Sequence, residues 1–394
     1  MSKDVKNVPA LRFKGYSDAW EKRKLGELAE FINGRAYKQD ELLTSGKYPV
    51  LRVGNFYTND KWYYSDLELP EKYYAEKGDL LYTWSATFGP HIWIGPKVIY
   101  HYHIWKVALK NLFEKDFALQ FFEADRVRLL NSTNGSTMIH VTKKEMESKG
   151  ILLPDISEQR NIGELLRKAD DLIAATQRRI DDLEQVEKTL LQHLFDQSWR
   201  FNVYSDPWVK SKVANMAKEN FGGGTPSTKK RSFWTGSLPW IQSSDLDKSN
   251  KYTVIPKKFI SSAALKSSAA KKVPSNSIAV VTRVGVGKLA FINYDYATSQ
   301  DFLSFSFLNW SAFFSVNLLT RVMEQMSNEG QGTSIKGVTK SELLAKSVLI
   351  PTSLEEQISI GNLLKSFDDL IKSTSNRLSK LELLKTSLLK NLFV

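Results

Sequence analysis

The second half of the chain repeats the first, and this duplication constrains the fold more than any other feature. The segment 162-IGELLRKADDLIAATQRRIDDLEQVEKTLLQHLF-195 aligns with 360-IGNLLKSFDDLIKSTSNRLSKLELLKTSLLKNLF-393 at a constant offset of 198 residues. Upstream, 135-GSTMIHVTKKEM-146 aligns with 332-GTSIKGVTKSEL-343, and 12-RFKGYSDAW-20 aligns with 200-RFNVYSDPW-208. A repeat with a period of half the chain predicts two similar structural units.

Between these anchors the two copies diverge. Weak similarities remain between 48-YPVLRVGNF-56 and 238-LPWIQSSDL-246, and between 79-DLLYTWSATFG-89 and 277-SIAVVTRVGVG-287. The divergent blocks contain short apolar runs at 78–84, 92–100, 278–282 and 302–308, and candidate helices at 116–131 and 311–326. Strand-rich segments with one or two helices predict two similar α+β domains that carry different side chains.

A heptad pattern marks each long repeated segment as a helix. Apolar residues recur at alternating steps of four and three residues, with polar exceptions at the same two places in each copy. In the first copy the positions are 162, 166, 169, 173, 176, 180, 183, 187, 190 and 194, and in the second they are 360, 364, 367, 371, 374, 378, 381, 385, 388 and 392. This pattern predicts two helices of about 40 residues, roughly 60 Å long, that pair as an antiparallel coiled coil with pseudo-twofold symmetry.

Several details of these helices follow from the same pattern. Thr176 and Thr374 lie near the middle of each apolar seam, so we expect them near the crossing point of the pair. Ser157 and Ser353 lie near the helix starts, and either is a candidate N-cap. The predicted organisation is a domain at 1–153, a helix at 154–197, a second domain at 198–350 and a second helix at 351–394.

The charge of the chain favours an anionic partner. The formal net charge is +12, and a basic balance of this size is typical of nucleic-acid binding. Residues 227–288 hold twelve Lys/Arg and two acids, whereas the matching stretch 35–97 holds eight of each. The charge argument therefore supports the second domain better than the first, which is instead rich in Tyr and Trp.

Other features narrow the class of protein. The chain has no cysteine, which excludes thiolate catalysis and disulfides and fits a reducing cytoplasm. The chain contains no run of about 18 apolar residues, so no membrane span is predicted. Neither 222-GGGTPS-227 nor 285-GVGK-288 has P-loop spacing, and Asp206-Pro207-Trp208 lacks the second proline of a methyltransferase motif. His101 and His103 alternate along an expected strand, but no carboxylate pattern accompanies them to suggest a metal site.

The duplicated motifs resemble those of specificity subunits of bacterial type I restriction–modification enzymes. Each copy opens with Trp20 or Trp208 in a Tyr-Ser-Asp-x-Trp context. Each closes with a Gly-Ser/Thr segment, an apolar-Pro step and a Glu-Gln pair before the long helix. These closing motifs are Gly135–Thr137, Leu153–Pro154 and Glu158–Gln159, then Gly332–Ser334, Ile350–Pro351 and Glu356–Gln357. The family often has Pro-Pro at the proline step, where this chain has Pro-Asp and Pro-Thr.

The resemblance implies a non-catalytic subunit in which each domain recognises one half of an asymmetric, bipartite site on double-stranded DNA. It implies two modification subunits, which bind S-adenosylmethionine and methylate adenine, and restriction subunits that use ATP and Mg to translocate and cut. This chain itself is expected to bind no cofactor or metal.

Candidate DNA-binding residues follow from base chemistry, since Arg and Lys suit guanine and Asn and Gln suit adenine. In the first domain they are Arg35, Tyr37, Lys38, Arg52, Asn55, Trp84 and Ser85. In the second they are Thr225, Lys229, Lys230, Arg231, Gln242, Ser243, Arg283 and Lys336.

Two other interpretations remain open at this point. One is a stand-alone DNA-binding regulator, which would bind DNA tightly without modification subunits. The other is a scaffold that uses its helices to join proteins, which leaves the basic stretch and the divergent domains unexplained.

Overall fold

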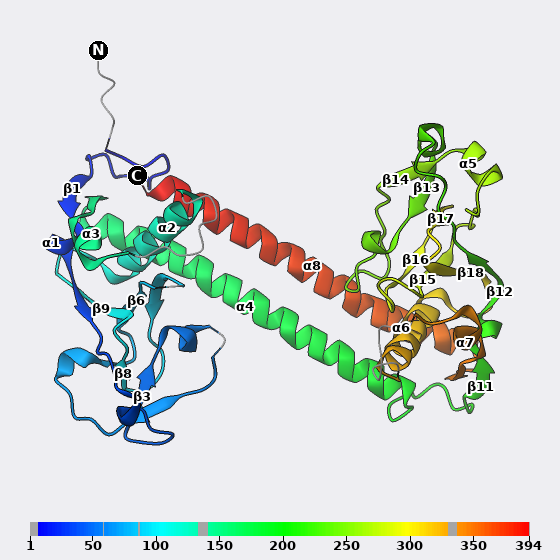
Figure 1. Cartoon of the computed structure of the whole chain (residues 1–394), viewed down its shortest axis with the longest axis horizontal. Helices are drawn as coiled ribbons and strands as arrows, with labels where there is room; N and C mark the ends of the chain where they lie inside the picture. Colours follow the sequence, from blue (N-terminus) through cyan, green and yellow to red (C-terminus); the bar gives the residue numbers. More distant parts are fainter. Residues whose placement is uncertain (1–6, 58, 86, 133–140, 330–336, 394) are drawn as a thin grey trace, which may run out of the picture. The chain divides into compact units, whose positions relative to one another are not determined.

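The computed structural model describes residues 7–57, 59–85, 87–132, 141–329 and 337–393. The chain forms two compact units (Figure 1). Unit 1 holds the chain up to Ala175 together with Leu378–Val394, and unit 2 holds Thr176–Arg377. Each long helix therefore contributes a part to each unit. The four boundaries expected from the sequence remain a prediction.

Unit 1 contains two four-stranded sheets and a two-stranded ribbon. One sheet has the order β2-β9-β6-β7, the other β4-β3-β8-β5, and the ribbon is β1-β10. The strands are β1 Glu21–Lys24, β2 Ala29–Asn33, β3 Tyr48–Leu51, β4 Tyr63–Ser65, β5 Tyr74–Ala75, β6 Leu80–Thr83, β7 Gly89–Ile92, β8 Val98–Tyr100, β9 Ile104–Leu109 and β10 Gly150–Leu153. The helices are α1 Leu25–Leu28, α2 Lys115–Ser132, α3 Lys143–Ser148 and the first half of α4, Ile156–Phe195.

Unit 2 repeats this topology, except that its second sheet has three strands and no counterpart of β5. Its sheets have the orders β12-β18-β15-β16 and β14-β13-β17, and β11 pairs with β19. The strands are β11 Val209–Lys212, β12 Ala217–Gly222, β13 Leu238–Ile241, β14 Lys258–Ile260, β15 Ser277–Val281, β16 Leu289–Ile292, β17 Ala297–Thr298, β18 Phe302–Leu308 and β19 Ser347–Ile350. The helices are α5 Ser262–Lys266, α6 Ala312–Glu329, α7 Lys340–Ala345 and the first part of α8, Leu354–Leu392. The predicted use of one α+β fold twice is confirmed.

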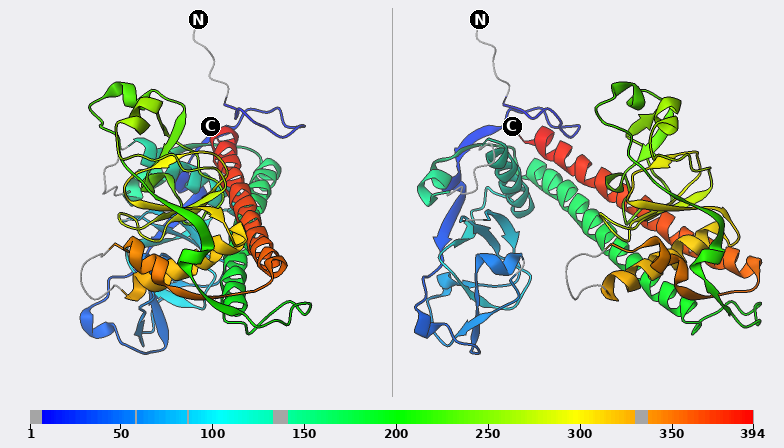
Figure 2. Two further views of the ribbon diagram at one scale, coloured as in Figure 1. Left: turned by 90° about the vertical axis from the view of Figure 1, so that its right-hand side faces the viewer. Right: turned by 45° about the vertical axis from the view of Figure 1, so that its right-hand side comes forward.

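The two long helices bury the predicted seam. All ten heptad positions of α4 and all ten of α8 are buried or half-buried, including Thr176 and Thr374. In unit 1 the start of α4 and the end of α8 share one core, through Leu166 and Leu392. In unit 2 the end of α4 and the start of α8 share another core, which α6 completes (Figure 2). The helix segments are thus antiparallel within each unit, as predicted.

A charged layer interrupts the seam differently in the two units. In unit 1 Lys385 of α8 forms an ion pair with Asp170 of α4. The equivalent residues in unit 2 are Glu187 and Asp368, which have the same charge. Lys251, a buried residue of the second domain, forms ion pairs with both, at 3.2 and 3.1 Å. The second domain therefore supplies the cation that its own pair of helix segments lacks.

The duplicated Trp and Glu motifs form the same buried contact in both units. Glu158 is fully buried and accepts hydrogen bonds from the Arg12 guanidinium at 2.7 and 2.8 Å and from Trp20 Nε1 at 3.2 Å. In unit 2, buried Glu356 accepts equivalent bonds from the side chains of Arg200 and Trp208. These hydrogen bonds attach the first segment of each domain to the first turn of a long helix.

The glutamine that follows each of these glutamates forms hydrogen bonds to a second segment of its domain. The Gln159 side chain accepts from the backbone N–H of Glu114 and donates to the carbonyl of Pro154. Gln357 makes the equivalent bonds to Ser311 and Pro351. The Gly135–Thr137 and Gly332–Ser334 motifs lie outside the described residues.

One of the two candidate N-caps was wrong. Asp155, not Ser157, caps α4, because its Oδ1 accepts from the N–H groups of Ser157 and Glu158. Ser353 caps α8 as predicted, by accepting from the Glu356 N–H. The apolar run 92–100 is not one strand, since the chain leaves β7 at Ile92 and enters β8 only at Val98.

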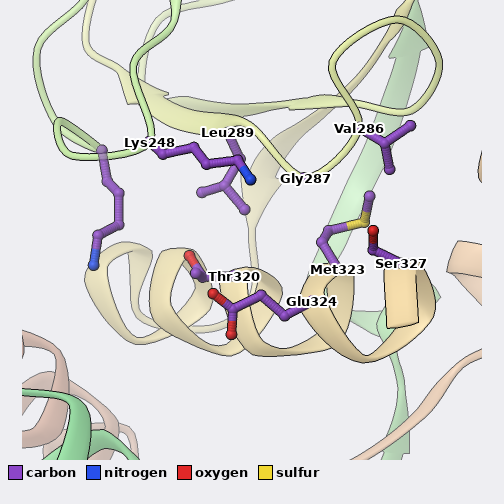
Figure 3. Close-up of a pocket in the computed structure, with 9 residues that line it drawn as sticks. Lys248, Val286, Gly287, Leu289, Thr320, Met323, Glu324 and Ser327 are labelled. Carbon is purple, nitrogen blue, oxygen red and sulfur yellow. The ribbon is translucent and has the colours of Figure 1, made fainter. Parts of the chain in front are cut away.

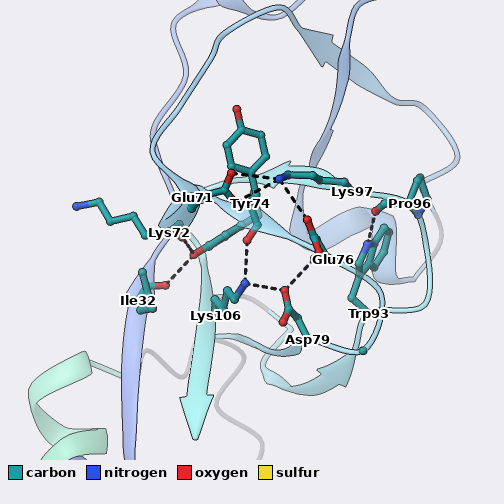
Figure 4. A network of polar contacts seen from close by, with 12 residues as sticks. Ile32, Glu71, Lys72, Tyr74, Glu76, Asp79, Trp93, Pro96, Lys97 and Lys106 are labelled. Carbon is teal, nitrogen blue, oxygen red and sulfur yellow. Dashed lines mark hydrogen bonds and ion pairs between the residues drawn. The ribbon is translucent and has the colours of Figure 1, made fainter.

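A polar network ties the two sheets of unit 1 together (Figure 4). Lys106 of β9 contacts Asp79 Oδ2 at 2.7 Å and donates to the Tyr74 carbonyl of β5 at 3.1 Å. Tyr100 of β8 donates to the Lys72 carbonyl at 2.5 Å. These contacts keep the ends of the strands from the two sheets in fixed positions.

We expect Glu158→Gln to destabilise unit 1 by about 3–5 kcal/mol, because it removes the only carboxylate that faces the mostly buried Arg12 among the described contacts. Glu356→Gln should affect unit 2 similarly. Glu164→Gln, which breaks an exposed helix ion pair with Lys168, should cost much less, because solvent screens that pair. Urea unfolding measures all three, and equal losses would contradict the structural role of Glu158.

The charged layer also predicts a pH effect. Burial raises the pKa of Asp368 to about 6, partly offset by Lys251. A carboxyl with a raised native pKa favours folding most when protonated, so its contribution declines as pH rises from about 4 to 6. Asp368→Asn removes that decline. Its unfolding free energy relative to wild type should therefore increase between pH 4 and pH 6, and a constant difference would contradict the assignment.

Candidate nucleic-acid interface

Several strand ends meet at one end of each domain. In unit 1, β2 ends beside Trp105, β6 ends beside Ile104, and β3 ends beside Tyr100. The turn 101–103 between β8 and β9 therefore lies among the segments that follow β2, β3 and β6. We call this set, residues 34–35, 52, 84–85 and 101–103, the strand-end surface of domain 1.

Domain 2 has an equivalent surface. Its β12, β15 and β13 end beside Leu303, Phe302 and Thr298. The turn 299–301 lies among the segments that follow them. The strand-end surface of domain 2 comprises residues 223–225, 242, 282–283 and 299–301. An open groove along it is lined by Gly223, Arg283, Gln300 and Thr339, among others.

The same backbone hydrogen bonds hold both turns. His101 N–H donates to Leu51 O at 2.9 Å, and Ser299 N–H donates to Ile241 O at 3.0 Å. Trp84 N–H donates to His103 O at 3.2 Å, and the Thr282 N–H donates to the Asp301 carbonyl at 2.8 Å. The scaffold is therefore shared, while the side chains it presents differ: His-Tyr-His in domain 1 and Ser-Gln-Asp in domain 2.

Glycine is required at positions 34 and 223, where the chain lies against the turns 101–103 and 299–301. A Cβ on Gly34 would lie 2.3 Å from His101 O, and one on Gly223 would lie 1.9 Å from Ser299 O. Any larger residue would push the strand end away from the turn. A Cβ on the neighbouring Gly222 would contact nothing within 4 Å.

The structure brings four of the seven residues predicted for domain 1 to its strand-end surface. Arg35, Arg52, Trp84 and Ser85 lie there. Arg35 forms a bidentate ion pair with Glu41. This pair lowers the pKa of the Glu41 carboxyl. The Arg52 guanidinium lies 4.4 Å from the Tyr63 ring centroid, and Trp84 Nε1 donates to the Tyr102 carbonyl.

The other three residues lie beside this surface and serve local structure. Tyr37 packs against the core of the second sheet, and burial raises its pKa. The Asn55 side chain accepts from the Arg52 N–H and donates to the carbonyls of Asn59 and Lys61. Lys38 is exposed beside Glu41.

In domain 2, the predicted residues Thr225, Gln242 and Arg283 lie on the strand-end surface. Ser243 adjoins it, since its carbonyl accepts from Lys288 Nζ at 3.3 Å. Lys229, Lys230 and Arg231 are exposed on the loop that precedes Trp234, whose ring lines a second groove with Thr225 and Gln242. Lys336 lies outside the described residues.

Two lysines of the basic stretch already form ion pairs within unit 2. Lys251 is buried in the charged layer of the helices, and Lys272 contacts Asp295 at 2.7 Å. Lys251 also borders a pocket of about 250 Å³ between α6 and the loop that carries Val286 and Gly287 (Figure 3). The same loop carries Arg283.

The turn residues themselves were missed from the sequence. Tyr102 is 39 % exposed, Gln300 is exposed, and neither belongs to a shared motif. His101 and His103 lie on this turn rather than on a strand, with their ring centroids 5.0 Å apart. Burial lowers the pKa of His101 to about 4, so it is neutral at pH 7 and offers hydrogen bonds rather than charge.

Comparison with known proteins identifies the family. The family model described as the type I restriction modification DNA specificity domain matches residues 17–185 and again 205–383. The chain belongs to this specificity family. The two matches each contain one domain and most of one long helix, so the duplication seen in the sequence is a duplication of the family's unit.

Relatives and solved structures agree with the specificity-subunit assignment. The MjaIX specificity subunit of Methanocaldococcus jannaschii is 29 % identical over 198 residues, which cover 48 % of this chain and 44 % of the relative. The match thus spans less than half the length of that relative. The EcoR124I/EcoR124II specificity subunit of Escherichia coli is 23 % identical over 387 residues, 94 % of this chain and 85 % of the relative.

The fold matches that of specificity subunits as well. The S subunit of a type I restriction–modification system from M. genitalium superposes with a TM-score of 0.67 at 13 % identity, covering 98 % of this chain and 99 % of that one. A second structure, described as bearing on complex assembly of the type I system, gives a TM-score of 0.57 at 16 % identity, covering 94 % of this chain and 96 % of that one. At these identities the likeness concerns the fold.

The described residues of the chain contain no group of three or more His, Asp or Glu that could hold a metal ion. Its described helices include none that is long and apolar enough to cross a membrane.

We expect Gly223→Ala to disrupt the strand-end surface of domain 2, because its Cβ would overlap the Ser299 carbonyl. Gly222→Ala, one residue earlier, should be tolerated. Hydrogen exchange of the backbone around residues 298–302 distinguishes them: faster exchange in Gly223→Ala alone is the expected result. Equal exchange in both variants would mean that the close approach is not needed.

Proposed function

We propose that this chain recognises an asymmetric, bipartite site on double-stranded DNA, with one half-site bound by the strand-end surface of each domain. One observation supports the proposal above all. The turns at 101–103 and 299–301 are held by the same backbone hydrogen bonds but expose different side chains. A duplicated scaffold with diverged contacts suits two unlike half-sites, whereas identical surfaces would suit a palindrome.

The charge of domain 2 supports a DNA partner. Lys229, Lys230, Arg231 and Arg283 are exposed on or beside its strand-end surface, and phosphate contacts by such residues supply much of the affinity for DNA. Domain 1 offers aromatic and neutral polar groups around Tyr102 instead. The half-sites would then differ in how strongly salt weakens their binding.

In this proposal the long helices set the distance between the two DNA-binding surfaces. Reading surfaces on one face of B-DNA must lie about one helical turn, 34–36 Å, or a multiple apart. Helices of 40 and 39 residues have the length to set such a distance. The gap between half-sites would then be constant.

Duplicated apolar residues on these helices support a partner that binds twice. Three pairs related by the 198-residue offset are exposed in both helices: Ile156 and Leu354, Leu172 and Leu370, Val186 and Leu384. Single exposed apolar residues are common on protein surfaces, but their repetition at the same offset is what two copies of one partner would require. We assign them to two copies of a modification subunit, to which a restriction and translocation subunit would be added.

In this scheme catalysis resides on the partners. The modification subunits would bind S-adenosylmethionine and methylate adenine at N6, and the restriction subunits would use ATP and Mg, in the cytoplasm where the DNA lies. This chain supplies sequence selection. The stand-alone regulator is the alternative, and tight specific binding by the purified chain alone would favour it.

Arg283→Ala tests the assignment of the DNA face. In the complex with modification subunits, we expect weaker binding to target DNA and a salt dependence whose slope is reduced by about 0.9, the value for one lost phosphate contact. Lys272→Ala is the matched control, because Lys272 is paired with Asp295 at the other end of the same sheet. Gel-shift titrations from 50 to 200 mM salt measure both; an unchanged slope in Arg283→Ala would contradict the assignment.

A further inference from the structure

The side chain of Gln300 stands at the centre of the strand-end surface of domain 2. It is exposed at the tip of the turn 299–301 and lines the groove with Arg283. Its Oε1 accepts a hydrogen bond of 2.5 Å from the Thr225 hydroxyl. In this arrangement the amide oxygen faces Thr225.

The backbone beneath Gln300 is held on both sides. Ser299 N–H donates to Ile241 O, and Ser299 Oγ donates to the Asp301 carboxylate at 3.1 Å. The Asp301 carbonyl accepts from both the N–H and the hydroxyl of Thr282. A turn with this many bonds presents its central side chain with little freedom, which reduces the ordering cost of binding.

A side-chain amide is chemically matched to one base. Gln donates from Nε2 to adenine N7 and accepts at Oε1 from adenine N6–H, a pair of contacts that no other base offers in the major groove. Thr225 occupies one lone pair of Oε1 and leaves the other for N6–H. No described residue accepts from Nε2.

We propose that Gln300 is a specificity-determining residue of domain 2 that recognises an adenine, and that Thr225 is the positioning residue that orients its amide. The inference rests on the proposed function, since it names the base chemistry of the same surface. The equivalent position in domain 1 is Tyr102, on the same scaffold. Tyr102 lacks the amide, so the two half-sites should differ at this contact.

The test is sequence selection from a random DNA library by the complex with modification subunits. Wild type should select two unlike half-sites. Gln300→Ala should lose preference at one adenine of one half-site by roughly 5- to 150-fold, and leave the other half-site unchanged. The second half-site is an internal control for folding and assembly.

Two further variants sharpen the result. Thr225→Val should reduce preference at the same adenine by a smaller factor, because the amide remains but its orientation is freed. Asn293→Ala removes an exposed amide beyond β16, at the opposite end of the sheet, and should change nothing.

The outcomes separate the two claims. If wild type selects no sequence, the proposed function fails. If wild type selects two half-sites and Gln300→Ala selects the same bases at every position, the inference about Gln300 is overturned while the proposed function stands. A change in Thr225→Val at a different base from that lost in Gln300→Ala would overturn the positioning role.

Discussion

The burial of one apolar seam on each long helix is the constraint on which the rest of the structure depends. A helix of 40 residues with a single apolar stripe is not stable alone in water and must cover that stripe. Here every seam position of α4 and of α8 is buried or half-buried. Within each unit, the ends of both helices also enter the core of a domain. A domain and a part of the helix pair are therefore one folding unit. Unit 1 is assembled from two separate segments of the chain, whereas unit 2 is one continuous segment.

Buried polar contacts specify how each domain attaches to this frame. Glu158 and Glu356 each bind an arginine and a tryptophan from the segment that opens a domain. Lys251 balances two carboxylates that would otherwise repel. Such groups contribute less net stability than apolar packing, but a misplaced domain would leave a buried charge unpaired. The contacts therefore fix position more than they add stability, and a recognition surface requires fixed position.

Much of this architecture could be predicted from the sequence, because repetition and heptads are properties of residue order. The sequence-based predictions failed for features that depend on the three-dimensional arrangement of the atoms. Asp155 and Ser157 are both reasonable N-caps in sequence, and only the geometry of the first turn selects Asp155. His101 and His103 alternate as they would on a strand, yet β8 ends before them. Tyr102 and Gln300 share no motif, so only the shared hydrogen bonds of their turns show that they are equivalent. Extending the 198-residue offset past Tyr100 would have been the one available signal.

The central claim is that two unlike surfaces, held by one frame, select DNA together. The most direct measurement is a genome-wide map of methylated adenines in cells that co-express this chain with the proposed modification subunit. The account predicts that every methylated site shares two short, different sequences separated by a constant number of unspecified bases. A palindromic site, one uninterrupted sequence, or two sequences at variable spacing would contradict it.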